Sequence, residues 1–291
     1  MADRLSYAVV TPVRNEAENL PRLAASLKAQ TRQPTAWIVV DTGSTDHTVA
    51  IARGLERSLP FLTVVTDSSG TARVERGAPV TRGFQLGLDA LADPPDVAVK
   101  LDADVSFEAD YFERLVEQFE RDPALGIASG TCYERHGGVW RQRHVTATTV
   151  WGASRAYRWS CLREVTPLEE RMGWDGVDEF KANVRGWRTS TVLELPFRHH
   201  RTEGERDGAA RARRGQGAAA YYIGYRFSYL ALRAVFHSRH DRAALSMVLG
   251  FALAALRGAP RLEDPRARAF LRDRQRIRAL PARLREATGR R

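Results

Sequence analysis

Asp102 and Asp104 flank Ala103 directly after the apolar stretch DVAVKL, and this pair is the strongest chemical signal in the chain. Alternation along the chain can bring both carboxylates toward one divalent ion. Mg²⁺ and Mn²⁺ prefer such hard oxygen ligands and keep water and substrate phosphates in the rest of their shell. Asp-x-Asp also occurs in ordinary solvated loops, but its position after an apolar run favours a metal site for a phosphorylated substrate.

Two other polar segments follow apolar runs in the same way. TPVRNEAENL comes after YAVV, and DTGSTDHT comes after WIVV. Ligands of open parallel sheets bind beyond the carboxyl ends of the strands. We therefore expect all three polar segments to lie around one binding site.

Three acids in the segment MGWDGVDEFKANVRGW are candidates for a general base: Asp175, Asp178 and Glu179. Their spacing of i, i+3 and i+4 places them on one face of a helix. The alternative is that one or more of them stabilises the N-terminus of the helix through its dipole.

The segment around Trp151 and Arg155 is rich in Trp and Arg. Aromatic rings stack on sugars, and Arg can bind phosphate or carboxylate groups. We expect these two residues on the acceptor side, although packing in the core is the commoner role for a Trp.

Apolar runs alternate with amphipathic stretches through the first 200 residues, which predicts a Rossmann-like α/β fold with a mostly parallel sheet flanked by helices. The expected elements are strands near 7–11, 35–41, 61–67, 96–102, 126–133 and 189–197, and helices near 20–30, 47–56, 80–91 and 111–120.

A C-terminal helical extension is expected after this domain. The Gly- and Arg-rich segment 201–217 predicts a mobile loop, followed by helical patterns at 221–239 and 243–256 and a basic helix at 265–287 that is interrupted near Pro281. We place a boundary near Arg214, giving a catalytic domain at 1–214 and an extension at 215–291.

The chain of 291 residues has a net charge of +10, and its basic residues are concentrated in the extension. Residues 201–291 contain 21 Arg, no Lys and 8 acids, a net +13, so the remainder carries −3. This asymmetry is expected of a segment that meets an anionic surface, either lipid or nucleic acid. A GC-rich genome would also favour Arg over Lys.

Several features bear on the cellular location. No secretory signal is visible at the N-terminus, and Cys132 and Cys161 have no metal-ligand spacing, so we expect reduced thiols and a cytoplasmic protein. The apolar run 243–256 is shorter than the roughly 20 residues that cross a bilayer. It is expected either to lie in the surface of an anionic membrane at its inner face or to pack on the catalytic domain or a second subunit.

Three spaced motifs resemble those of glycosyltransferase family 2. They are Pro12-Val13-Arg14-Asn15-Glu16, Val40-Asp41-Thr42-Gly43-Ser44-Thr45-Asp46 and Asp102-Ala103-Asp104, and the similarity extends through about the first 200 residues. Thr42 stands where the family often has a second aspartate. The resemblance implies the GT-A fold and an inverting transfer of a sugar from a nucleoside diphosphate, most commonly UDP. The acceptor would be a hydroxyl of a glycan, a lipid-linked molecule or a small molecule, and the reaction would use Mg²⁺ or Mn²⁺.

The resemblance also implies roles for residues of the donor site. Asp41 accepts a hydrogen bond from the base, Arg82 approaches the donor, and Asp104 is the more direct metal ligand. His199 or His200 completes the metal shell. The residues expected along the base, ribose and diphosphate are Pro12, Arg14, Asn15, Glu16, Asp102 and Ala103, although helix capping is an alternative role for Asn15 and Glu16.

For the general base, the family carries an acidic pair at a helix start, some eleven residues before a glycine. Asp175 precedes Gly186 by that spacing, whereas Asp178-Glu179 resembles the pair with its order reversed. We therefore rank Asp175 first, Asp178 second and Glu179 third.

Parts of the sequence are compatible with two other functions. A sugar-phosphate nucleotidyltransferase would favour a Gly-rich basic phosphate loop after the first strand, and TPVRNEAENL contains no glycine. A nucleic-acid-binding protein would use the Arg-rich tail with the Rossmann-like part as support, and steep loss of binding with salt would identify it.

Overall fold

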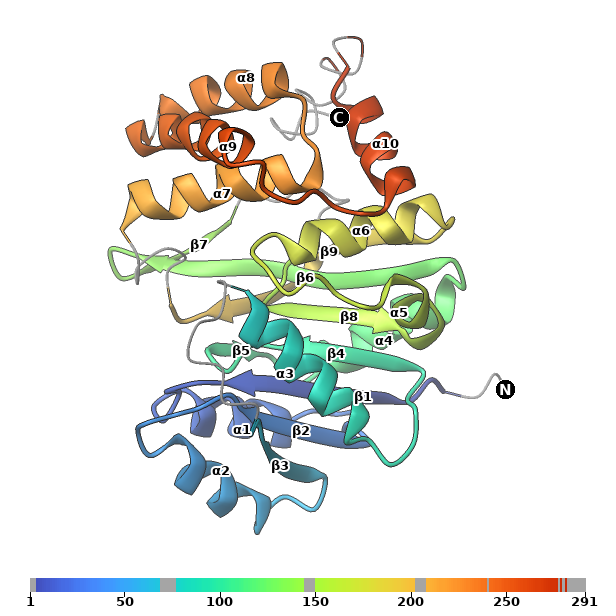
Figure 1. Ribbon diagram of the computed structural model, residues 1–291. Helices are drawn as coiled ribbons and strands as arrows, with labels where there is room; N and C mark the ends of the chain where they lie inside the picture. The colour runs from blue at the N-terminus through green and yellow to red at the C-terminus, as the bar shows by residue number, and fades with distance from the viewer. Residues whose placement is uncertain are drawn as a thin grey trace.

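The computed structural model describes residues 4–68, 77–143, 150–201, 208–239, 241–276, 278 and 281. One twisted sheet runs through the molecule, with helices on both of its faces and a helical layer at the end opposite the first strands (Figure 1). The strands are β1 Tyr7–Val13, β2 Ala36–Asp41, β3 Leu62–Thr66, β4 Val97–Leu101, β5 Val105–Phe107, β6 Leu125–His136, β7 Val139–Gln142, β8 Ser154–Arg158 and β9 Arg188–His199.

The strand order is β3-β2-β1-β4-β8-β6-β9-β5, with β7 paired to β6. The four strands β3, β2, β1 and β4 are parallel, as predicted. Beyond β4 the sheet is mixed, because β8 runs antiparallel to both β4 and β6, whereas β6 and β9 are parallel. The predicted Rossmann-like α/β architecture is therefore confirmed, and β5, β7 and β8 are additions to the strands expected from the sequence.

Both faces of the sheet are buried. Along β1, Val9 faces one apolar cluster and Val10 faces the other, as the two-residue period of a strand requires. Helices α1, α2 and α4 contribute to the first cluster, and α3, α5 and α6 contribute to the second. Covering both faces explains why the parallel strands are almost continuously apolar.

The helices alternate with the strands and then continue alone toward the C-terminus. They are α1 Leu20–Lys28, α2 Thr48–Glu56, α3 Ala78–Asp89, α4 Tyr111–Arg121, α5 Trp159–Val165, α6 Trp174–Val184, α7 Ala209–Ile223, α8 Phe227–Ser238, the 3₁₀ turn η1 Arg242–Leu245, α9 Ser246–Leu256 and α10 Pro265–Arg274.

The predicted loop at 201–217 is wrong from Ala209 onward, since α7 begins there; residues 202–207 lie outside the described part of the chain. The glycines of α7 serve close packing instead of flexibility. A Cβ added at Gly217 would lie 1.9 Å from the carbonyl oxygen of Met247, and one at Gly250 of α9 would lie 2.0 Å from that of Arg214. Glycine at both positions lets the two helix backbones touch.

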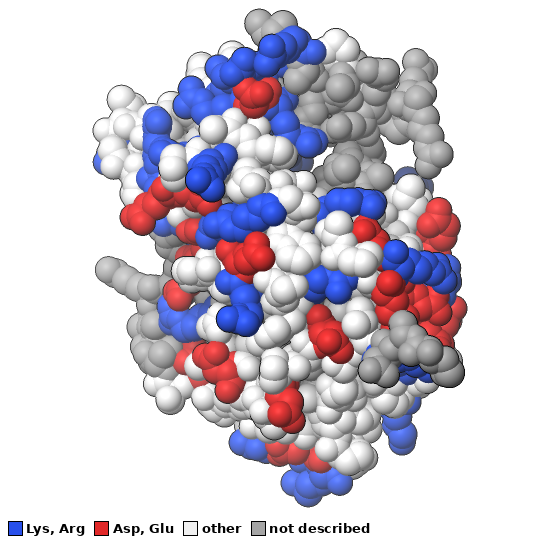
Figure 2. All heavy atoms as spheres, turned by 90° about the vertical axis from the view of Figure 1, so that its right-hand side faces the viewer, with Lys and Arg blue, Asp and Glu red and all other residues white. Residues whose placement is uncertain are grey.

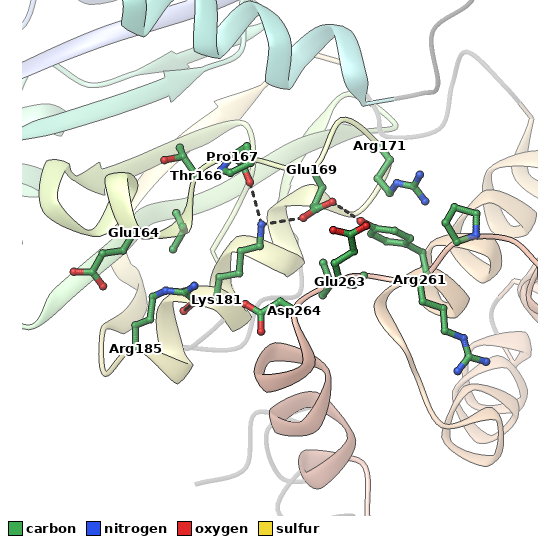
Figure 3. A pocket seen from close by; sticks show the side chains of 14 residues that line it. Glu164, Thr166, Pro167, Glu169, Arg171, Lys181, Arg185, Arg261, Glu263 and Asp264 are labelled. Carbon is green, nitrogen blue, oxygen red and sulfur yellow. Dashed lines mark hydrogen bonds and ion pairs between the residues drawn. The ribbon is translucent and has the colours of Figure 1, made fainter.

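The C-terminal helices pack against α6. Val177 of α6, Tyr222 and Ile223 of α7, and Leu262 and Leu271 belong to one buried cluster. A cavity of about 550 Å³ beside this contact is lined mainly by the segment between α5 and α6, by α6 and by residues 260–264 (Figure 3). The boundary predicted near Arg214 falls inside α7.

Polar contacts reinforce the same junction. Lys181 of α6 pairs with Glu169 at 2.9 Å, and the hydroxyl of Tyr222 also donates to Glu169 (Figure 3). Among the described helices, none has the length and apolarity needed to cross a bilayer.

Candidate active site

The loops after β1 and β2 hold each other in place at the carboxyl end of the sheet. The side-chain oxygen of Asn15 accepts a hydrogen bond from the backbone N–H of Thr45 at 2.8 Å, and the Asn15 N–H donates to the Ser44 hydroxyl at 3.0 Å. Asn15 has φ +57°, a left-handed conformation that Asn tolerates better than most residues. Asn15 therefore shapes this rim of the site.

Asp41, the last residue of β2, is buried and accepts a hydrogen bond from the Ser44 N–H at 3.1 Å. Val13 lies beside it in the sheet, Pro12 pairs with Val40, and Arg14 is exposed. Helix α3 closes over this corner, because a Cβ at Gly83 would approach both Pro12 and Thr42 to 3.0 Å. The neighbouring Arg82 pairs with Glu170 at 2.8 Å.

Asp102 and Asp104 follow β4. The N–H of Asp102 donates to the Ala153 carbonyl at 2.8 Å, and its carboxylate pairs with the buried Lys100. Ala103 packs into the core between them. Burial raises the pKa of Asp102, and the charge of Lys100 opposes that rise.

Strand β5 brings His199 to Asp104. Val105 pairs with His199 across β5 and β9, which places the His199 Nε2 3.3 Å from an Asp104 carboxylate oxygen. The other ring nitrogen, Nδ1, lies 3.4 Å from the buried Glu134 of β6. A histidine that ligates a metal commonly has its second nitrogen held by a carboxylate in this way.

His200 is directed elsewhere. Its Nε2 hydrogen-bonds the Ser106 hydroxyl at 2.8 Å, and its ring packs edge-on against Trp140. Burial and the charge of Arg22 lower the pKa of His200 to about 4. Of the two histidines, the geometry places only His199 in the acidic cluster.

The acidic cluster is compensated by positive charge. Arg201 forms two hydrogen bonds to Glu16, at 2.9 and 2.8 Å, and lies 3.4 Å from Asp104. Burial opposes a charge on His199, but its contacts with Asp104, Cys132 and Glu134 outweigh burial and raise its pKa to about 12. Burial likewise works against ionised Asp104, yet His199 and Arg201 lower the pKa of that carboxyl.

These donors fit a divalent cation. Asp102, Asp104 and His199 each offer one ligand atom, and these three atoms lie within 4.8 Å of one another. Two carboxylates and an imidazole are suitable ligands for Mn²⁺ or Mg²⁺. A second group, Cys132, Glu134 and His199, shares the histidine.

Sequence reasoning missed three residues of this cluster: Lys100, Glu134 and Arg201. A lysine inside the apolar run before Asp102 was a usable signal, since a buried lysine requires a partner. Arg201 adjoins the two histidines in sequence. Glu134 gave no local signal, because its position beside His199 depends on the pairing of β6 with β9.

The acids of α6 divide into two groups. Asp178 and Glu179 are buried and face Arg155 of β8, which is itself fully buried. The Arg155 Nε donates to Asp178 at 3.0 Å, and its Nη1 lies 3.3 Å from Glu179. Burial raises the pKa of Asp178 to about 6 and that of Glu179 to about 8, against the opposing charge of Arg155.

Asp175 lies outside that ion-pair cluster and is partly exposed. A Cβ added at Gly152 would lie 3.2 Å from the Asp175 Oδ2, so the carboxylate borders the backbone at Gly152. The Gly152 carbonyl accepts a hydrogen bond from Lys100 at 2.9 Å, and Lys100 in turn pairs with Asp102. The Asp175 carboxylate therefore lies beside Gly152, whose carbonyl shares Lys100 with Asp102 of the metal-binding edge.

The expectation that Arg155 faces an acceptor is wrong, because burial and its pairing with Asp178 and Glu179 remove it from the surface. Trp151 is half-buried and packs against the core, with Arg143 over its ring at 5.5 Å.

Several solved structures have a fold similar to that of this chain. A mannosyltransferase from Pyrobaculum calidifontis in complex with GDP-Man and Mn²⁺ has a TM-score of 0.60 at 20% identity, covering 99% of this chain and 84% of that one. GalNAc-T7 with UDP, GalNAc and Mn²⁺ has a TM-score of 0.61 at 13% identity, covering 90% and 56%. TarS of S. aureus has a TM-score of 0.55 at 16% identity, covering 75% and 40%. The predicted GT-A fold is confirmed.

One curated relative is similar in sequence. The 4,4'-diaponeurosporenoate glycosyltransferase of Staphylococcus haemolyticus (strain JCSC1435) is 29% identical over 125 residues, which are 43% of this chain and 31% of the relative. The matched region thus spans about a third of that relative. The family model for glycosyl transferase family 2 matches residues 8–169, more than half of the chain. With its three motifs gathered at one edge of a GT-A sheet, this chain belongs to glycosyl transferase family 2.

Proposed function

We propose that the protein transfers a sugar from a nucleoside diphosphate to an acceptor hydroxyl, with inversion at the anomeric carbon. The observation that carries this proposal is the position of the Asp175 carboxylate. It is not ion-paired to Arg155. It lies beside Gly152, whose carbonyl accepts a hydrogen bond from Lys100, the partner of Asp102. Family membership, the GDP-Man bound by the mannosyltransferase and the UDP and GalNAc bound by GalNAc-T7 support the choice of substrate class.

In the proposed reaction Asp175 accepts the proton of the acceptor hydroxyl. The hydroxyl oxygen forms a bond to the anomeric carbon from the face opposite the diphosphate. The bond between that carbon and the diphosphate oxygen breaks, and its electron pair stays on the oxygen. The nucleoside diphosphate leaves. A general base of this kind contributes on the order of 10²–10⁴ in rate.

Asp102, Asp104 and His199 would hold Mn²⁺ or Mg²⁺, and Glu134 would orient the imidazole of His199. When bound, a divalent cation neutralises charge that develops on the leaving diphosphate. Asp41 and the loop from Pro12 to Glu16 would contact the base and ribose, with UDP the first nucleotide to test.

Calorimetric titration with UDP-, GDP- and dTDP-sugars, with and without Mn²⁺, tests the donor and metal assignments. We expect Mn²⁺-dependent binding of one donor class by the wild type. Asp104→Asn should abolish the Mn²⁺ dependence, and His199→Ala should weaken Mn²⁺ binding about 10- to 100-fold.

His200→Ala is the matched control, because its imidazole is turned toward Ser106 and Trp140. Unchanged Mn²⁺ binding by Asp104→Asn, or equal losses in the two histidine variants, would contradict the metal assignment.

A further inference from the structure

Exposed hydrophobic side chains are concentrated on the C-terminal helices. Of the nine large hydrophobic residues that are exposed in the described part of the chain, seven belong to α8, η1 and α9. These seven are Phe227, Leu232, Val235, Phe236, Leu245, Leu249 and Leu256. We refer to them as the C-terminal apolar surface.

Helix α9 shows why this surface is unusual. Its buried residues Met247, Gly250 and Ala254 lie on the side that includes the close contact with α7. Leu245, the last residue of η1, and Leu249 and Leu256 of α9 are 50% or more exposed. Their spacing of four and seven residues places them on one helical stripe. A helix that is apolar on all sides is normally covered on all sides. The exposed stripe of α9 therefore predicts a partner.

The charge around the surface is almost entirely positive. From Gly208 to Leu262 the sequence has nine Arg and a single acid, Asp241, which pairs with Arg213 at 2.8 Å. Arg233, Arg239 and Arg242 are exposed, as is Arg257, and across the described ranges none of them is ion-paired to a carboxylate. Figure 2 draws the side of the molecule on which α10 lies, and there too Lys and Arg predominate over the upper, C-terminal part, whereas both signs mix below.

We propose that the C-terminal apolar surface docks on an anionic lipid bilayer. Leu and Phe side chains enter the boundary between headgroups and acyl chains, and Arg233, Arg239, Arg242 and Arg257 contact lipid phosphates. This docking is additional to sugar transfer and does not depend on it.

Two other partners fit the surface less well. In a two-fold dimer the surface would meet its own copy, and unpaired Arg would then face Arg without acids to neutralise them. Nucleic acid would match the Arg residues, but its phosphates offer nothing to exposed Leu249 and Leu256. A bilayer supplies both an anionic surface and an apolar interior.

Vesicle flotation of the full chain tests the proposal. The vesicles contain phosphatidylcholine with or without phosphatidylglycerol at about 30% of the lipid, which gives a negative surface potential. We expect binding to the anionic vesicles at least about tenfold stronger than to neutral ones. Leu249→Glu with Leu256→Glu should reduce that binding about 100-fold, because each exchange removes an apolar side chain that would enter the bilayer and adds a negative charge.

Arg239→Gln with Arg242→Gln should weaken binding about tenfold or more and reduce its salt dependence. The matched controls lie far from the C-terminal helices in sequence: Leu193→Glu, an exposed leucine of β9, and Arg57→Gln, an exposed arginine after α2. Both should bind anionic vesicles like the wild type.

Failure of the wild type to float with anionic vesicles would overturn the proposal, as would equal losses in the control variants. A concentration-dependent dimer that Leu249→Glu abolishes would assign the surface to a second copy instead. Sugar-nucleotide binding by each variant, measured in parallel without lipid, reports on folding and on the donor site. Loss of lipid binding with intact donor binding is thus distinguishable from failure of the proposed function.

Discussion

At the residue scale, α6 separates three neighbouring acids by what they face. Asp178 and Glu179 pair with the buried guanidinium of Arg155, whereas the Asp175 carboxylate borders the backbone at Gly152. Removing one partner of a buried ion pair leaves an uncompensated charge, typically costing 3–5 kcal/mol. The same acid-to-amide exchange should therefore have different consequences along one helix.

Asp175→Asn should lower the turnover of donor by about 10²–10⁴ with an unchanged melting temperature, because the amide cannot accept the acceptor proton. The measurement is release of nucleoside diphosphate together with thermal unfolding. Asp178→Asn is the control and should instead lower the melting temperature. Full turnover in Asp175→Asn would exclude Asp175 as the base.

Glu179 gives a pH dependence of stability. Burial raises its pKa from 4.5 to about 8, so between these values the folded protein holds the proton more tightly than the unfolded chain does. The free energy of unfolding contributed by this group is therefore present at low pH and is lost as pH rises toward 8. Glu179→Gln should have a melting temperature that varies less between pH 5 and about 8 than the wild type's. Identical pH profiles would argue against a raised pKa.

At the element scale, the contact between α7 and α9 depends on glycine. A Cβ at Gly217 would lie 1.9 Å from a backbone oxygen, which no side-chain movement can relieve. The two helices would have to separate, and overpacking of this kind costs at least about 1–3 kcal/mol.

Gly217→Ala should accordingly lower the free energy of unfolding by at least about 1–3 kcal/mol in denaturant titration. Gly54→Ala in α2 is the matched control, since the nearest atom to its added Cβ is 3.9 Å away. That substitution should stabilise the protein by up to about 1 kcal/mol through helix propensity. A neutral effect at Gly217 would mean that the two backbones are not in contact.

The short strands show where local patterns were insufficient. The parallel strands were predicted because buried β-branched runs between turn residues are recognisable in a single sequence. β8 was missed, because its sequence SRAYR contains Arg155, which is stable in the interior only with the acids of α6 beside it. β5 has three residues and exists through its pairing with β9.

At the scale of the whole molecule, α6 is shared between the sheet and the C-terminal helices. Trp174 and Ala182 pack under the sheet, whereas Val177 packs with Tyr222 and Leu262. Arg185 also lies 3.6 Å from Asp264, near α10. Loosening the C-terminal helices should therefore disturb the helix that carries Asp175.

We predict a single unfolding transition in differential scanning calorimetry, detected equally by probes on both sides of Arg214. Truncation after residue 207 should lower the melting temperature and the affinity for the donor together, since it exposes Val177 and Phe180. Two separate transitions, or a truncated chain with wild-type stability, would instead support independent units on either side of the boundary.

The sequence by itself determined the parallel half of the sheet and the edge of the sheet that carries Asp41, Asp102 and Asp104. Those features follow from chain direction and strand period, which are local. Tertiary structure decided that His199 and not His200 joins the acids, and that a Gly- and Arg-rich segment forms α7. It also decided that Arg155 pairs with the carboxyl groups of Asp178 and Glu179 but only with the backbone carbonyl of Asp175. Each of these depends on a partner distant in sequence, because burial of a charge or a close backbone contact is stable only once that partner is in place.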